Sequence, residues 1–241
     1  MAEPILSLAG VNTHIGQYHI LQGVDFEVPR AGLTMLLGRN GAGKTTTLRT
    51  IMGLWKASAG AIRYDGAEIT RHATPELAQL GIAYVPENMG IFAGLTVREN
   101  LLLAARSGPP DEQRLEWIFR LFPAMKQFWN GLAGNLSGGQ KQMLAIARAI
   151  VEPRKLLLVD EPTKGLAPSI IANMIEAFRE LKRSETSLLV VEQNFHFART
   201  LGDTVAVMDS GRIVHTGGMA ELAADEPLLT KLLGLSLETH Q

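Results

Sequence analysis

The stretch Leu33-Thr-Met-Leu-Leu37-Gly38-Arg-Asn-Gly-Ala-Gly43-Lys44-Thr45 decides the fold of this chain. An apolar strand runs into a glycine-rich loop of the pattern G-x-x-x-x-G-K-[ST], and a helix is predicted over 44–52. Such a loop turns successive backbone N–H groups inward, and the helix that follows adds the positive end of its dipole. The pattern therefore predicts a phosphate-binding loop. The residues expected around the phosphates are Gly38, Arg39, Asn40, Gly41, Ala42, Gly43, Lys44, Thr45 and Thr46.

Two carboxylates follow a second apolar strand, in Leu156-Leu-Leu-Val-Asp160-Glu161. A strand buried on both faces does not end in paired acids for packing, because burying charge is costly. Ligands of parallel sheets bind at the carboxyl edge of the strands. There we expect Asp160 to hold Mg²⁺ through water and Glu161 to orient or deprotonate an attacking water. For the pair taken alone, a solvated Asp-Glu turn remains the alternative.

A third element is Leu136-Ser-Gly-Gly-Gln140. Ser137 is a good N-cap for the helix predicted over 140–151, and the two glycines expose backbone N–H groups at its mouth. The pattern indicates a second helix terminus suited to a phosphate. The plain alternative is a capped helix after a loop, but that alternative does not explain two such termini in one chain.

Composition narrows the function classes. The 241 residues are 46% hydrophobic and 20% charged, which is typical of a globular protein and excludes disorder, collagen and coiled coil. The net charge of −1 gives no sign of a nucleic-acid partner. Because there is no cysteine, disulfides and thiol nucleophiles are excluded. Apolar runs fall far short of the ~18 residues of a membrane span, and no signal peptide is recognisable, so we expect a cytoplasmic chain.

Strands and helices alternate along most of the chain. Strands are predicted at 5–11, 20–28, 33–37, 60–66, 81–85, 155–160, 188–191, 204–208 and 212–216, and helices at 44–52, 75–80, 97–106, 112–122, 140–151, 170–181, 195–201 and 218–233. We therefore expect an α/β protein with a mainly parallel sheet, an antiparallel β layer at its N-terminus and an inserted α-helical subdomain. The predicted boundaries are 1–94 and 136–241 for the α/β core and 95–135 for the insertion, in one domain over 1–241.

The three motifs, in this order and over essentially the whole chain, resemble the ATP-binding subunits of ABC transporters. The resemblance implies a P-loop NTPase fold, ATP and Mg²⁺ as cofactors, and two subunits packed head to tail. Each ATP would then lie between Gly43, Lys44 and Thr45 of one subunit and Ser137, Gly138, Gly139 and Gln140 of the other. It further implies that Lys44 and Glu161 act in catalysis and that Thr45 and Asp160 hold the metal.

Four positions depart from the general family pattern, and one of them is Ala167, near which many relatives have an aspartate. Glu87 stands where a glutamine normally senses Mg²⁺, so we expect it among the metal ligands. Gln193 replaces the usual catalytic histidine; it can hydrogen-bond a γ-phosphate but carries no proton at neutral pH. Ile15 stands at the aromatic position that stacks on adenine, and Tyr18 is the nearest aromatic; both are adenine-site candidates. His196 is expected at the surface or in a helix cap.

The departures are similar to those of the branched-chain amino-acid importer branch (LivF type): Pro86-Glu87, Gly165-Leu-Ala-Pro168 and Glu192-Gln-Asn194. Importers of urea and amides share part of this pattern and remain an alternative. The resemblance implies an identical or related second ATPase subunit, two integral membrane permease subunits, an indirect extracytoplasmic binding protein, and a peripheral place on the cytoplasmic face of the membrane.

Two other function classes remain open, namely a soluble ATPase acting on nucleic acid or ribosomes and a nucleotide-binding regulator. Of the aromatic residues between 92 and 129, Phe92 and Trp129 are those expected to be exposed.

Overall fold

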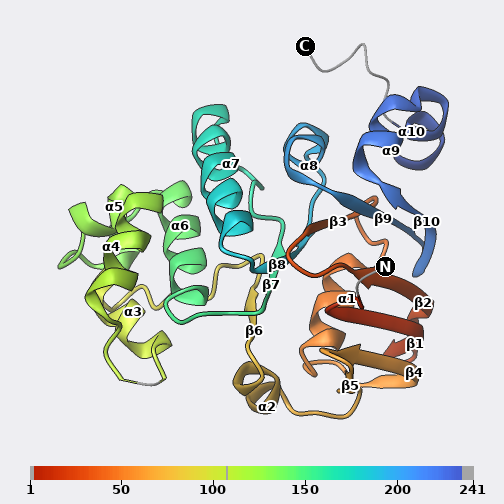
Figure 1. Cartoon of the computed structure of the whole chain (residues 1–241), viewed down its shortest axis with the longest axis horizontal. Coiled ribbons are helices and arrows are strands. Elements are labelled where there is room, and N and C mark those ends of the chain that lie inside the picture. The colour runs from red at the N-terminus through yellow and green to blue at the C-terminus, as the bar shows by residue number, and fades with distance from the viewer. Residues whose placement is uncertain (1–2, 107, 235–241) are drawn as a thin grey trace.

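The computed structural model describes residues 3–106 and 108–234, which fold around two β-sheets (Figure 1). The first sheet is antiparallel, with strand order β2-β1-β4-β5. Its strands are β1 (Leu6–Ile15), β2 (Tyr18–Val28), β4 (Ala57–Tyr64) and β5 (Ala67–Glu68). The second sheet has the order β10-β9-β3-β8-β7-β6. Its strands are β3 (Leu33–Leu37), β6 (Ile82–Val85), β7 (Leu156–Asp160), β8 (Ser187–Val191), β9 (Thr204–Asp209) and β10 (Arg212–Gly218).

The second sheet is parallel except for the β9–β10 hairpin. Strands β3, β7 and β8 are buried along their whole length, which explains their continuous apolar sequences. Because β3 pairs with β8 and β8 pairs with β7, the loops that follow these strands leave the sheet at one edge. The phosphate-loop sequence, Asp160-Glu161 and Glu192-Gln193 therefore lie side by side, as the sequence predicts for the first two.

Helices cover both faces of this sheet (Figure 1). They are α1 (Lys44–Ile51), α2 (Thr74–Gln79), α3 (Val97–Ala104), α4 (Glu112–Leu121), α5 (Pro123–Gln127), α6 (Gly138–Ala149), α7 (Pro168–Arg183), α8 (Phe195–Leu201), α9 (Met219–Ala224) and α10 (Glu226–Leu233), with a 3-10 turn η1 (Ala133–Asn135). One core cluster lies between the two sheets and includes Leu48 and Ile51 of α1. The other lies on the opposite face, under α6, α7, α8 and α9.

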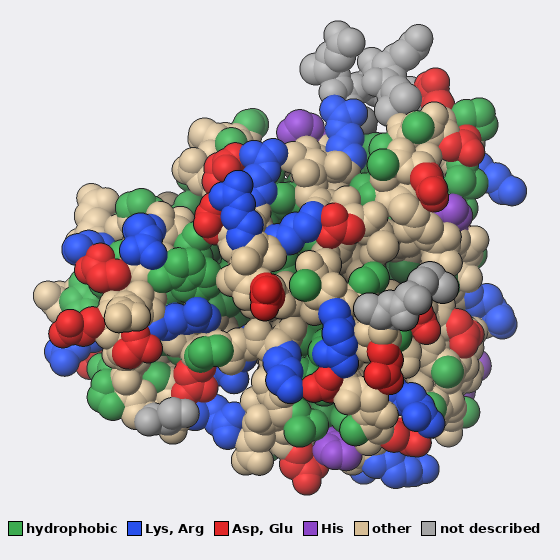
Figure 2. Space-filling model, viewed as in Figure 1, with side chains coloured by type: hydrophobic (Ala, Val, Ile, Leu, Met, Phe, Trp, Pro, Cys, Tyr) green, Lys and Arg blue, Asp and Glu red, His purple; other side chains and the backbone are tan. Residues whose placement is uncertain are grey.

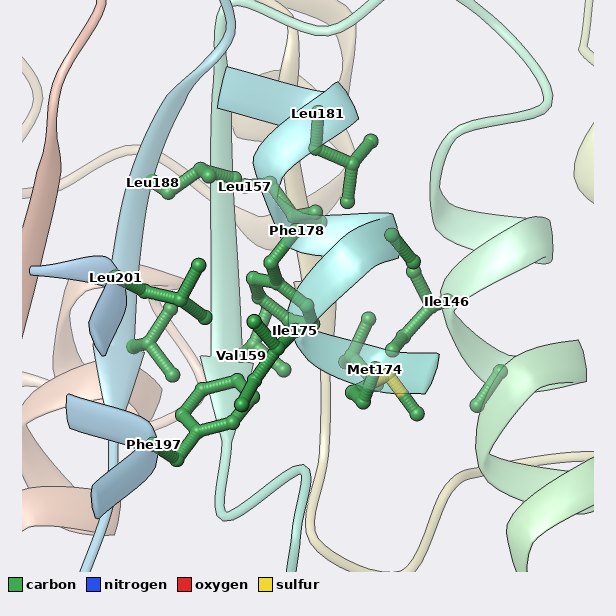
Figure 3. Close-up of a cluster of buried hydrophobic side chains, with 14 of the residues drawn as sticks. Ile146, Leu157, Val159, Met174, Ile175, Phe178, Leu181, Leu188, Phe197 and Leu201 are labelled. Atoms are coloured by element: carbon green, nitrogen blue, oxygen red, sulfur yellow. The ribbon is translucent and has the colours of Figure 1, made fainter. Parts of the chain in front are cut away.

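The second core cluster fixes the helices that carry the candidate site. Phe178 of α7 and Phe197 of α8 meet edge to face, with their ring centroids 5.4 Å apart, and both side chains are fully buried. Figure 3 shows these rings between Ile146 of α6, Val159 of β7 and Leu201 of α8. The strand that ends in Asp160-Glu161 is therefore packed against three helices.

Helices α3, α4 and α5 and the turn η1 all fall within residues 95–135 and form a lobe beside α6 (Figure 1). The α-helical block that interrupts the α/β order is thus present, and the α/β fold with its antiparallel β layer is confirmed. The boundaries at 94/95 and 135/136 stay a prediction. Buried side chains of the block, such as Ile118 and Phe122, belong to the same cluster as those of α6 and α7.

Some expectations of detail change. The tail predicted as one helix over 218–233 divides into α9 and α10, because the Asp225 carboxylate caps α10 by accepting from Leu228 N, with a proline in the first turn. Phe92 is exposed as expected, with 49% of its surface accessible. Trp129 is half-buried instead, since it packs edge to face on Phe119 with centroids 5.3 Å apart. His196 is exposed.

Within residues 3–106 and 108–234, no helix is both long and apolar enough to cross a membrane. On the face seen in Figure 2, acidic and basic side chains are interspersed. This pattern agrees with the net charge of −1 and shows no single-sign stripe on that face.

Candidate active site

The loop between β3 and α1 requires glycine at its first position. Gly38 has a φ of 147°, and a Cβ there would lie 2.2 Å from the carbonyl oxygen of Met208. Gly43 closes the loop with a φ of 110° and precedes the first residue of α1. Arg39, Asn40 and Gly41 are exposed, whereas Ala42 is buried and Thr46 is half-buried. The loop therefore presents its outer residues to solvent at the N-terminus of a helix, as an anion cradle requires.

Lys44 is buried at the start of α1, and its ammonium is enclosed by its own loop. Nζ donates to the carbonyl oxygens of Gly38 (2.8 Å) and Arg39 (3.0 Å) and lies 4.0 Å from Oε1 of Glu161. Burial lowers the pKa of Lys44, and the Glu161 carboxylate opposes that shift. A cation in this position is available to a phosphate that enters the loop.

Thr45, in the first turn of α1, meets Asp160, the last residue of β7, as predicted. The Thr45 hydroxyl donates to Oδ1 of Asp160 over 3.1 Å, and the Tyr84 hydroxyl donates to Oδ2 over 3.3 Å. Burial raises the pKa of Asp160 to about 6, with the neighbouring Glu161 carboxylate acting in the same direction. A buried carboxylate beside a hydroxyl supplies two of the oxygen ligands that Mg²⁺ prefers, and Mg²⁺ completes its shell with waters and phosphate oxygens.

Glu161 occupies a strained position directly after β7. Its φ of 49° lies in the left-handed region, which is uncommon for a residue with a side chain and often marks a functional site. Its side chain is 8% exposed. Gln193, from the loop after β8, donates from Nε2 to Oε1 of Glu161 over 2.5 Å. Two of the residues expected to act in catalysis are therefore in direct contact.

Glu192 lies at the site, although its sequence position pointed only to the family resemblance. Its carboxylate is 2% exposed and accepts hydrogen bonds from the backbone and hydroxyl of Thr163 and from the backbone N–H groups of Gln193 and Asn194. It therefore joins the loop after β7 to the loop after β8. Burial raises the pKa of Glu192, and these four hydrogen bonds oppose the rise. The sequence could have indicated Glu192, because it is an acidic residue directly after a buried strand. The same pattern indicated Asp160.

Glu87 lies in the loop after β6, at the edge where it was expected. Its Oε1 accepts from Nζ of Lys164 over 2.5 Å, and the same Nζ lies 3.4 Å from Oε2 of Glu161. The Glu87 charge also contributes to the raised pKa of Asp160. Lys164 was not singled out by sequence, because its hydrogen-bond partner Glu87 comes from another loop, 77 residues away.

The turn Leu136–Gln140 forms the N-terminus of α6. The Ser137 hydroxyl accepts from Gln140 N, and the Gln140 side chain accepts from Ser137 N, so the two residues form a capping box. Gly139 packs on α7, where a Cβ would lie 2.7 Å from Cγ2 of Ile170. Gly138 is exposed, and a Cβ there would meet nothing within 4 Å. In the described part of the chain these hydrogen bonds close within the turn and do not reach Lys44 or Glu161.

Ile15 and Tyr18 flank the turn of the β1–β2 hairpin, where Ile15 is half-buried and Tyr18 is 65% exposed. The hairpin is tied to the phosphate loop through one glycine. Gln22 N donates to the Gly211 carbonyl, and Gly211 N donates to the Ala42 carbonyl, each over 2.8 Å. The antiparallel sheet therefore lies directly beside the phosphate loop. A residue that contacts adenine would have to lie in this position.

A groove of about 620 Å³ lies between the end of α1, the loop after β6 and α6. Trp55, Met89 and the side chain of Arg148 line it. Arg148 donates to the Gly90 carbonyl and its guanidinium lies 4.9 Å from the Phe92 ring centroid. No Asp or Glu is among the described residues that line the groove, so the groove combines an apolar floor with positive charge.

Comparison with known proteins gives the same assignment as the geometry. Residues 21–164 match the family model for "ABC transporter". A branched-chain amino acid transport ATP-binding protein of Pseudomonas aeruginosa, BraG, is 40% identical over 90% of this chain and 95% of its own length. A probable counterpart from Archaeoglobus fulgidus, LivF, is 34% identical over 96% of this chain and 99% of its own length.

Among solved structures, an ATP-binding cassette of an ABC transporter superposes with a TM-score of 0.81, at 26% identity, over 95% of this chain and 98% of that one. The match includes the phosphate loop and Asp160-Glu161, and the fold is shared over nearly the full length. The chain therefore belongs to the ABC transporter family and is one of its ATP-binding subunits, an ATPase.

Proposed function

We propose that this chain powers an ABC importer of branched-chain amino acids by hydrolysing MgATP at the edge formed by β3, β7 and β8. One observation carries the proposal. The start of α1 (Lys44, Thr45), the end of β7 (Asp160, Glu161) and the loop after β8 (Gln193) converge there, through side-chain contacts of 2.5–4.0 Å. The two branched-chain amino acid transport proteins that resemble the chain over most of its length support the substrate class.

In this proposal the loop Gly38–Lys44 binds the phosphates of ATP. Backbone N–H groups from Arg39 to Thr45 hydrogen-bond the phosphate oxygens, and Lys44 leaves its own carbonyl partners to neutralise the charge of the β- and γ-phosphates. Thr45 and Asp160 hold Mg²⁺, which neutralises phosphate charge when bound. Ile15 and Tyr18 form the wall on the adenine side.

Glu161 acts on the attacking water. Its Oε2 faces the side where Lys164 lies, and its Oε1 is fixed by Gln193. Gln193 therefore orients the carboxylate that accepts a proton from the water, and its side-chain carbonyl oxygen is an acceptor that can position that water. Lys44, Glu161 and Gln193 are the three catalytic residues of the proposal.

The turn Leu136–Gln140 serves a second copy of the site. Ser137 and Gln140 hydrogen-bond each other, and across the described residues neither side chain bonds to the phosphate loop of the same chain, while Gly138 is open to approach. A head-to-tail dimer with an identical or related ATPase subunit would place Ser137, Gly138, Gly139 and Gln140 on the γ-phosphate bound by the partner. Binding energy present only in the closed dimer can then shift a membrane partner between conformations.

The groove beside α6 is the proposed contact with the membrane half of the importer. Its apolar floor and Trp55 fit a short amphipathic segment of a permease subunit, and two such permeases and an extracytoplasmic binding protein would complete the assembly. The chain then works as a peripheral subunit on the cytoplasmic face of the membrane. No nucleic-acid partner is proposed.

The test is purification of the tagged chain from membranes of its own host, followed by assays of the complex. We expect integral membrane subunits to co-purify, MgATP turnover, and leucine uptake when the complex and its binding protein are reconstituted in vesicles. The Lys44→Ala complex should assemble without turnover or uptake. Co-purification of ribosomal or nucleic-acid components, or leucine uptake that survives Lys44→Ala, would contradict the proposal.

A further inference from the structure

Lys164 joins two carboxylates that come from different loops. Its ammonium is hydrogen-bonded to Glu87 over 2.5 Å and ion-paired with Glu161 over 3.4 Å. Glu87 follows β6 and Glu161 follows β7, and both strands are parallel neighbours. The bridge therefore connects the loop that lines the groove, where Pro86, Asn88 and Met89 flank Glu87, to the carboxylate at the reaction centre.

The two carboxylates compete unequally for the ammonium. The shorter distance gives Glu87 the full hydrogen bond, and that bond is the largest cause of the raised pKa of Lys164. Glu161, at 3.4 Å, exerts mainly charge attraction. Removing Glu87 would leave Glu161 as the one anionic partner of Lys164 among the residues that the structure describes, and the ammonium would move onto it.

Such a movement matters because Glu161 has few free acceptor sites. Gln193 already donates to Oε1, and Lys44 lies 4.0 Å from the same oxygen. Oε2 is the oxygen left to receive a proton from water, and Lys164 is the cation beside it. If Lys164 donated a hydrogen bond directly to Oε2, it would occupy a lone pair of that oxygen. Its positive charge would also lower the basicity of the Glu161 carboxylate.

We propose that Lys164 is a positioning residue whose distance from Glu161 is set by Glu87, so that Glu87 acts through Lys164 and not as a ligand of Mg²⁺. The inference rests on the proposed hydrolysis at Glu161. It also gives the groove a route to the reaction centre. A partner segment that moves the loop after β6 also moves Glu87. Because Lys164 is bonded more strongly to Glu87, its ammonium moves with Glu87 and its distance from Glu161 changes.

A double-mutant cycle on MgATP turnover tests this route, using wild type, Glu87→Gln, Lys164→Met and the double variant of the full chain in its assembled complex. We expect Glu87→Gln to lower turnover about two- to five-fold and Lys164→Met to raise it by a similar factor, as befits an exposed ion pair. Glu87→Gln should have no further effect in the Lys164→Met background. Lys164→Arg, which keeps the charge, should stay near wild type.

An equal loss from Glu87→Gln in both backgrounds would overturn the proposal, because it would show that Glu87 acts directly. In that case the Mg²⁺ concentration for half-maximal turnover should rise in both variants that carry Glu87→Gln. Under the proposal that concentration stays unchanged.

A second measurement needs neither nucleotide nor metal. Reductive methylation of the nucleotide-free chain by formaldehyde and borohydride, with Lys164 followed by mass spectrometry, should be several-fold slower in Glu87→Gln, because the ammonium moves from the 41% exposed Glu87 side chain onto the 8% exposed Glu161 carboxylate. Glu116→Gln is the matched control, because Glu116 pairs with the exposed Lys126 at 3.3 Å and should leave the rate at Lys164 unchanged. An equal rate at Lys164 in wild type and Glu87→Gln would refute the pair. If the wild-type protein failed to hydrolyse MgATP, the proposed function would be refuted. The pairing of Lys164 with Glu87 would still be tested, because methylation of Lys164 needs no nucleotide.

Discussion

The Nε2 amide of Gln193 lies 2.5 Å from Oε1 of Glu161, which couples the loop after β8 to the carboxylate after β7. This contact gives a role to a residue that replaces the usual histidine of the family. Since Gln193 cannot carry a proton at neutral pH, its contribution is orientation.

Gln193→Ala should therefore lower kcat by about 10-fold or more, with a smaller change in the KM for ATP, because orientation of Glu161 matters most in the transition state. Steady-state kinetics on the assembled complex measures both constants. His196→Ala is the control, since this neighbouring side chain is exposed and should leave kcat unchanged. A rise in KM alone would show that Gln193 serves binding instead.

Lys44→Ala should reduce MgATP turnover by at least about 100-fold, because the site loses the charge that faces the developing negative charge of the transferred phosphoryl group. Hydrolysis assays with saturating ATP provide the measurement. Lys126→Ala, at an exposed lysine of α5, serves as the control and should keep full turnover. Normal turnover in Lys44→Ala would exclude the loop 38–45 as the phosphate site.

Ser137→Ala separates capping from catalysis. The loss of the cap should reduce the free energy of unfolding by about 0.5–2 kcal/mol. Thr96→Ala removes the equivalent capping box of α3, formed with Glu99, and should cost a similar amount. Only Ser137→Ala should also lower turnover of the assembled complex, because only Ser137 is proposed to face the partner's ATP. Equal turnover in the two variants would contradict that placement.

Phe178→Ala should destabilise the chain by about 3–5 kcal/mol, because it empties a fully buried site between α7, α8 and β7. Urea unfolding of the nucleotide-free chain measures this loss. Phe92→Ala provides the contrast at an exposed ring and should change stability by less than about 0.5–1 kcal/mol. Similar losses for the two variants would show that the cluster in Figure 3 is not the main core.

The sequence predicted the parts of the site that follow from strand order. Buried strands ending in Asp160-Glu161 and in the glycine loop must bring those residues to one edge once the strands are parallel, and the Thr45–Asp160 contact confirms this. The capping box of Ser137 follows from local spacing in the same way.

The contacts that depend on the course of loops were not predictable. Glu87 and Lys164 are 77 residues apart, and no periodicity relates them. The sequence identifies Tyr84 only as a residue of a strand. Its hydrogen bond to Asp160 depends on the pairing of β6 with β7 in the folded sheet. The burial of Trp129 likewise depends on where Phe119 of α4 lies, which the spacing of aromatics does not determine.

Hydrolysis of MgATP at Glu161 is best examined with the Glu161→Gln variant in the complex with its membrane and ATPase partners. Turnover and the identity of the bound nucleotide are measured on the same preparation. We expect turnover to fall by about 100-fold or more while unhydrolysed ATP stays bound, because the amide keeps the shape of the side chain but accepts no proton. Hydrolysis at the wild-type rate in Glu161→Gln would contradict the account.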